Sequence, residues 1–96
     1  MGVTVESIER PEPQMVEELG QVPTTILSDA MEKSQTMHSE IKPVYRIERI
    51  CGPAITARSI VADYMTAVAA IDYTQPGDII VIDVKGYKDA AVWGDL

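Results

Sequence analysis

The stretch Pro76-Gly77-Asp78-Ile79-Ile80-Val81-Ile82-Asp83-Val84 decides the fold. Its first three residues have the chemistry of a turn, and the run from Ile79 to Val84 is dominated by β-branched side chains that favour a strand. Because apolar residues point to both faces of this run, we expect a central strand in a sheet that is covered by helices.

The segments before this strand alternate between strand and helix. Residues 49–60 predict a strand of small residues, with a bend at Gly52-Pro53. A helix from an Asp63 cap to Asp72 should then lie on the sheet, because apolar residues recur there at spacings of three and four. This alternation predicts an α/β fold. The apolar stripe consists of Met65, Val68, Ala69 and Asp72, broadened by Ala67, Ala70 and Ile71.

The N-terminal part predicts a pair of short helices after a loosely held lead-in over residues 1–13. The first should run over residues 14–19 and close at Gly20 with a left-handed C-cap. The second should run from Ile26 to Lys33, with Thr24 or Thr25 as its N-cap. We expect residues 14–96 to form part of a single domain.

Residues 34–42 are polar, and we expect them to form a loop, which contains His38. Residues 43–47 alternate weakly and are interpreted as an edge strand. Cys51 is the only cysteine, so that the chain forms no internal disulfide. Its apolar neighbours favour a buried, inert thiol.

Composition excludes several classes of partner. The 96 residues, 46% of them hydrophobic, can hold one compact domain. The formal net charge of −7 opposes binding to nucleic acid or to an anionic membrane. No apolar run is long enough to span a bilayer, and no signal peptide begins the chain, so we expect a soluble, cytoplasmic protein.

The candidate site follows the best strand, over residues 86–96, because ligands of open α/β sheets usually bind at the carboxyl ends of strands. Within it, Gly94, Asp95 and Leu96 could open a helix whose free amides bind a carboxylate. From spacing alone, the alternative that Gly94 permits a turn and Asp95 caps a helix stays open. The sequence contains no nucleophile with a nearby base, no paired histidines and no phosphate-loop pattern.

Four blocks, in this order, resemble the family of the regulator of ribonuclease E activity A and the class II 4-hydroxy-4-methyl-2-oxoglutarate aldolases. They are residues 25–31 (TILSDAM), 52–56 (GPAIT), 76–83 (PGDIIVID) and 91–96 (AVWGDL). The third and fourth blocks are the most specific. The resemblance implies a three-layer β/β/α domain of the swivelling type, and a homotrimer or hexamer with active sites between subunits.

The resemblance also implies an activity and a site. Members cleave 4-hydroxy-4-methyl-2-oxoglutarate to two pyruvates and can decarboxylate oxaloacetate, with a divalent metal such as Mg²⁺ or Mn²⁺. The carboxylate of the small 2-oxo acid substrate sits on amides of a Gly-Asp-x-Leu turn, whose first three positions match Gly94, Asp95 and Leu96, while its fourth residue lies beyond these 96 residues. Metal and an arginine stabilise the enolate.

One departure from the family limits what we expect of this chain. The Arg-Asp pair that holds substrate and metal in the family is expected about twenty residues after the glycine, and Arg46 and Arg58 lie too early to replace it. We therefore expect an incomplete, N-terminal portion of the domain with no catalytic residue or metal ligand of its own. The alternatives are a non-catalytic regulator that binds a ribonuclease and a degenerate open reading frame.

The 96-residue chain should release no pyruvate from 4-hydroxy-4-methyl-2-oxoglutarate above background. Its scattered aspartates position no metal, and no cation meets the enolate. A coupled assay that follows pyruvate with and without EDTA measures this. EDTA-sensitive release by the purified chain would contradict the expectation.

Overall fold

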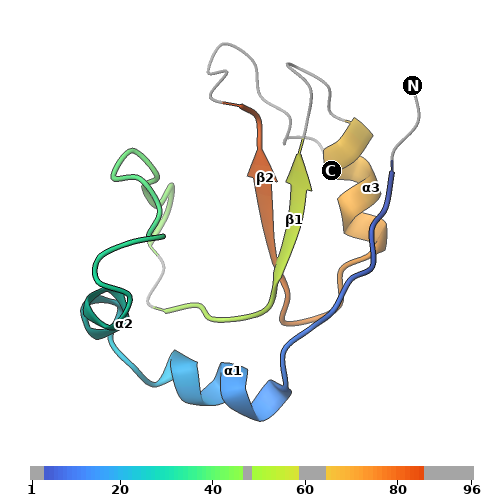
Figure 1. Cartoon of the computed structure of the whole chain (residues 1–96). Coiled ribbons are helices and arrows are strands. Elements are labelled where there is room, and N and C mark those ends of the chain that lie inside the picture. The colour runs from blue at the N-terminus through green and yellow to red at the C-terminus, as the bar shows by residue number, and fades with distance from the viewer. Residues whose placement is uncertain (1–3, 47–48, 59–64, 86–96) are drawn as a thin grey trace. The chain divides into compact units, whose positions relative to one another are not determined.

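The computed structural model describes residues 4–46, 49–58 and 65–85, and the elements lie along the chain as Figure 1 shows. Two compact units are present, and each is described by itself. One contains residues 1–10 and 53–96, and the other contains Pro11–Gly52. The elements are α1 (Pro13–Gly20), α2 (Thr24–Ala30), β1 (Ala54–Arg58), α3 (Met65–Asp72) and β2 (Ile79–Asp83).

The first unit is a β-α-β arrangement. β1 and β2 pair in parallel from Ala54↔Ile79 to Arg58↔Asp83, and the Ile79 amide donates to the Pro53 carbonyl at 2.8 Å just before the ladder. α3 lies between the two strands in sequence and packs on both (Figure 1). The α/β fold is therefore confirmed, while a three-layer arrangement stays a prediction.

The core lies between α3 and one face of β1. Ile55 is 4% exposed, Ala57 is also buried, and the residues on either side of them in β1 are exposed. On α3 the buried residues are Ala67 and Ala70, one helical turn apart. Their small side chains let the helix approach the sheet closely.

The buried face of α3 is rotated from the stripe that spacing predicted. Met65 and Asp72, which the prediction placed on that stripe, are both exposed. Alanines occupy the centre of the buried face because a helix that approaches the sheet closely leaves no room there for longer side chains. The Asp63 cap lies outside the described residues.

β2 is the predicted strand, but it is paired on one side only in the described part of the chain. Its first four residues are half-buried. A central position in a larger sheet thus stays a prediction. The edge strand predicted over residues 43–47 is wrong for residues 43–46, which adopt no strand, and Val44 is 97% exposed. The physical reason is that β-propensity acts only where a neighbouring strand provides pairing.

Gly20 does not form the predicted left-handed cap. It is the last residue of α1, and Gln21 follows in a right-handed conformation. A Cβ added to Gly20 would lie 3.3 Å from the Cβ of Cys51. The glycine is therefore needed for a close approach rather than for a positive φ. Cys51 is exposed, so the predicted buried thiol is wrong; its Sγ faces the Val16 carbonyl oxygen at 3.5 Å.

α2 begins and ends earlier than predicted. Its N-cap is Pro23 and no side chain caps it, so the expectation of a threonine cap is wrong. Thr24 is instead the first helical residue, because the fixed φ of Pro23 leads the chain into the helix. The helix ends at Ala30, and Glu32 and Lys33 adopt positive φ values of 56° and 60°, which end the helical conformation before Lys33.

Replacing Ile55 by alanine should lower the free energy of unfolding by about 2–5 kcal/mol, because it leaves a cavity against α3. The matched control is Ile50→Ala, since Ile50 is exposed and its truncation should change stability by less than about 0.5 kcal/mol. Urea unfolding followed by circular dichroism measures both. Equal midpoints for the two variants would show that β1 does not form the core.

Candidate functional site

The carboxyl edge of the β1–β2 sheet brings two opposite charges together. The parallel register pairs Arg58 with Asp83, the last residues of their strands. The Nε of Arg58 lies 3.6 Å from Oδ2 of Asp83. The other carboxylate oxygen, Oδ1, accepts the backbone N–H of Lys85 at 2.8 Å. The carboxylate is thus held by two groups at the end of the sheet.

Arg58 is a described residue at this edge that can bind an anion. Its side chain is 77% exposed, so the ion pair with Asp83 contributes little to stability. The contact uses Nε, and no described residue accepts a hydrogen bond from the terminal nitrogens. A guanidinium in this state can bind a carboxylate with two hydrogen bonds. Its location, at the carboxyl ends of parallel strands, is where ligands of α/β sheets are found.

The structure describes only some of the residues that the sequence analysis considered for a site. Gly94, Asp95 and Leu96 lie outside the described residues, and so does the helix expected over residues 89–96. The described chain leaves β2 at the edge that holds Arg58 and Asp83. His38 is exposed, and its Nδ1 accepts the backbone N–H of Glu40 at 3.0 Å, as suits a loop residue.

The described residues do not fit a divalent metal. Among them, no group of three or more His, Cys, Asp or Glu side chains could hold an ion. Asp83, a carboxylate that the structure describes at the edge, is paired with Arg58. Mg²⁺ normally needs one or two carboxylates that face an open position. We therefore assign no step of a reaction to a metal held by these residues.

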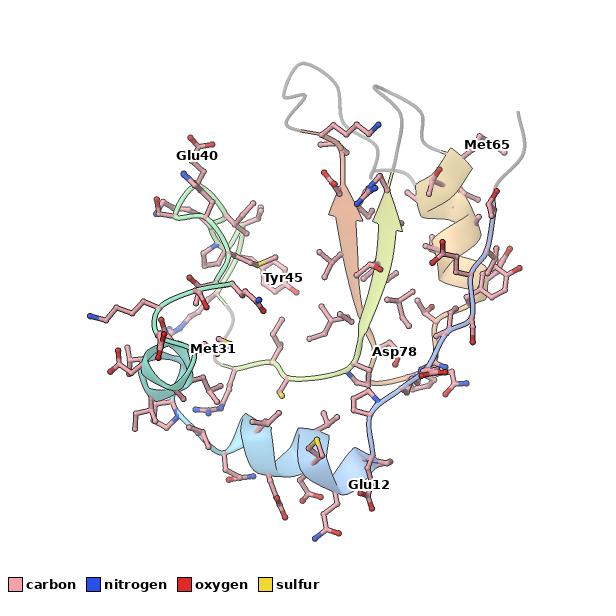
Figure 2. All side chains as sticks on the ribbon, viewed as in Figure 1. Glu12, Met31, Glu40, Tyr45, Met65 and Asp78 are labelled. Atoms are coloured by element: carbon pink, nitrogen blue, oxygen red, sulfur yellow. The ribbon has the colours of Figure 1, made fainter. Side chains whose placement is uncertain are left out.

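A part-buried ion pair lies at the opposite end of the sheet. Arg10 donates through Nε and Nη2 to the Asp78 carboxylate at 2.7–3.1 Å, and Nη2 also donates to the Tyr73 carbonyl at 2.9 Å. The Asp78 side chain is only 3% exposed. Figure 2 labels Asp78 at the start of β2. The lead-in, expected to be loosely held, is therefore anchored at Arg10. The limits of 1–13 and 14–96 stay predictions.

The turn before β2 explains why Pro76-Gly77-Asp78 starts this strand. Gly77 has a φ of +95°, which a residue with a side chain rarely adopts. Asp78 Oδ2 accepts the Gln75 N–H at 2.8 Å. The hydrogen bond from Arg10, with a smaller contribution from that N–H, holds the pKa of Asp78 below its ordinary value of 3.8. Asp78 in turn raises the pKa of Arg10, again mainly through the hydrogen bond.

Two arginines were missed when the sequence was read alone. Arg58 was set aside for its position in the sequence, although aligning the ends of the two strands would have paired it with Asp83. Arg10 gave no local signal, because its partner is 68 residues away.

The comparisons with known proteins identify the family. Residues 24–96 match the model of the RraA-like family, described as Aldolase/RraA. The chain belongs to this family. Over 75 residues it is 37% identical to a protein of Halalkalibacterium halodurans named "Putative 4-hydroxy-4-methyl-2-oxoglutarate aldolase". The match covers 78% of this chain and 36% of that protein, so the chain spans about a third of the relative's length.

The other comparison found nothing, since no solved structure matches the chain. None of the helices in the described ranges has the length and apolar character that crossing a membrane requires.

The Arg10–Asp78 pair should make stability depend on acid. Because the pKa of Asp78 is lower in the folded chain, its contribution is fully present above about pH 4 and is lost as the pH falls through the folded value. Asp78→Asn should lower the melting temperature at pH 7 by several degrees, on the order of 5–10 °C, and flatten its decline between pH 5 and 2.

The control is Asp29→Asn, because Asp29 is an exposed acid on α2. It should leave both the melting temperature and its pH profile close to those of the parent. Thermal melts at several pH values compare the variants. If Asp78→Asn and Asp29→Asn gave the same profile, the pair would not stabilise the fold.

Proposed function

We propose that this chain supplies the carboxylate-binding part of a metal-dependent lyase for small 2-oxo acids. The reaction is aldol cleavage of 4-hydroxy-4-methyl-2-oxoglutarate to pyruvate, together with decarboxylation of oxaloacetate. The observation that carries the proposal is the RraA-like match, because it extends over residues 24–96 and so includes Gly94, Asp95 and Leu96. The name of the relative gives it further support.

The geometry of the sheet is compatible with this role. The chain runs from the edge that holds Arg58 and Asp83 into the segment that contains Gly94. In the proposal, free amides after Gly94 donate to the substrate carboxylate, and the absence of a Cβ lets the carboxylate approach. Arg58 provides a positive charge at the carboxyl edge of the sheet. This charge suits the 2-oxo acid, which is an anion.

The proposal places the divalent metal in a complete, longer aldolase of this family. Mg²⁺ or Mn²⁺ would stabilise the enolate there, and the family's Arg-Asp pair would hold substrate and ion. The 96 residues contain no Arg-Asp dipeptide. A three-layer β/β/α domain, assembly into a homotrimer or hexamer and a cytoplasmic location complete the proposal.

Gly94→Val should weaken binding of pyruvate to the chain by about tenfold or more. An added side chain would crowd a carboxylate that must lie about 2.7–3.1 Å from the amides. Titration with pyruvate, followed by amide chemical shifts, measures the affinity. Asp95→Asn distinguishes the other interpretation, because a residue that only caps a helix should affect stability and leave pyruvate affinity unchanged.

A chimera then tests the reaction itself. It joins this chain to the part of the Halalkalibacterium halodurans protein that follows the matched region. Pyruvate release that EDTA abolishes, and that Gly94→Val reduces, is the expected result. A folded chimera without activity, together with equal pyruvate affinity of parent and Gly94→Val, would favour a non-catalytic regulator and overturn the proposal.

A further inference from the structure

Arg58 and Asp83 line a hollow in the first unit. The hollow has a volume of about 820 Å³, and residues of both strands, such as Thr56 and Val81, contribute to its lining. All of the lining residues belong to the first unit. The candidate anion site at the carboxyl edge of the sheet therefore opens on a defined space, which a small ligand can enter.

The size of this hollow cannot select one small anion over another. Binding pockets for drug-sized ligands have volumes of about 300–1,000 Å³, and the hollow lies within that range. Pyruvate and inorganic phosphate are both much smaller than such ligands. An exposed guanidinium also binds either of them, because its fork of donors matches carboxylate and phosphate oxygens alike. Any preference for a carboxylate must therefore come from charge.

Asp83 supplies a negative charge next to the guanidinium of Arg58. Its Oδ2 lies 3.6 Å from the Nε of Arg58, and its Oδ1 accepts the backbone N–H of Lys85 at 2.8 Å. Lys85 has a positive φ of 57°, which is uncommon for a residue with a side chain. An aspartate side chain that bonds the backbone two residues on stabilises such a turn. Because the backbone holds one carboxylate oxygen, we expect the negative charge to stay beside Arg58 when an anion binds.

The other charges of the hollow act in the same direction. Among the lining residues, all of them in the described part of the chain, Glu6, Glu9 and Asp83 are acids, and Arg58 is the base. An isolated guanidinium would attract an anion with two charges about twice as strongly as an anion with one, because Coulomb energy is proportional to charge. Asp83 cancels much of this attraction. The anion then gains mainly the hydrogen bonds of the terminal nitrogens, which a carboxylate accepts as well as a phosphate does.

We propose that Asp83 is a specificity-determining residue, which makes the Arg58 site accept carboxylates and reject phosphoryl groups. It acts through repulsion of the wrong ligand, which is a common source of specificity. This role rests on the proposed function, because it assumes that the carboxylate of a 2-oxo acid binds at this edge. It adds the class of compound that the site excludes, namely phosphorylated metabolites with two charges on one group.

Asp83→Asn tests this role, because it removes the charge while the amide oxygen can still accept the Lys85 N–H. At about pH 8, phosphate carries close to two negative charges, and pyruvate carries one. In low salt the substitution should raise the affinity for pyruvate about threefold and that for phosphate about tenfold, since the effect of a removed charge scales with the charge of the ligand. Titrations with pyruvate and with inorganic phosphate, followed by the chemical shift of the Lys85 amide, measure both affinities.

The matched control is Asp72→Asn, which changes the net charge equally at an exposed acid of α3 in the same unit. Asp72 does not line the hollow, so both affinities should stay unchanged. Arg58→Gln should weaken the binding of both anions, because it removes the donors that they share. Circular dichroism checks the fold of each variant.

The outcomes separate this role from the proposed function. If Asp83→Asn raised the affinity for phosphate no more than that for pyruvate, the specificity role would be overturned and the proposed function would stand. The same holds if Asp72→Asn acted equally, or if Arg58→Gln left both affinities unchanged. A parent chain that binds no pyruvate would overturn both proposals.

Discussion

The buried carboxylate of Asp78 is the constraint on which the first unit depends. A carboxylate that is 3% exposed is costly unless a positive charge and hydrogen bonds compensate it. Arg10 provides the charge, and the Gln75 amide provides a further donor. The same arginine reaches the Tyr73 carbonyl just after α3. One buried charge therefore joins the lead-in, the end of α3 and the turn, and it fixes where β2 begins.

The start of β2 at Ile79 determines which residues pair at the other end of the sheet. Once Ile79 lies opposite Ala54, the parallel ladder leaves no choice for the residues that follow, and Asp83 must lie opposite Arg58. A shift by one residue would turn Ile80 and Ile82 away from the face that carries Ile55 and Ala57. Packing against α3 thus protects the register. The candidate anion site at the carboxyl edge therefore depends on the Arg10–Asp78 ion pair at the other end of the sheet.

Local patterns predicted the elements whose cause is local. The β-branched run at β2, the turn at Gly77 and the existence of α1, α2, α3 and β1 all follow from neighbouring residues. Features that depend on distant partners could not be predicted in this way. Arg10 finds Asp78 across 68 residues, Gly20 is needed only because Cys51 approaches it, and residues 43–46 lack the neighbour that would make them a strand. At the carboxyl edge, Asp83 ends the strand that the sequence predicted, but its pairing with Arg58 could be found only from the register of the two strands.

β1 connects the core with the candidate site. Its inward face packs against the alanines of α3, and its paired edge fixes the register with β2. Arg58 ends this strand and contacts Asp83. A two-stranded sheet is marginal by itself, so the packing of α3 on both strands stabilises the backbone that carries Arg58. Under the proposed function, a cation on a backbone held in this way is partly preorganised, and a preorganised cation binds an anionic substrate at a lower entropic cost.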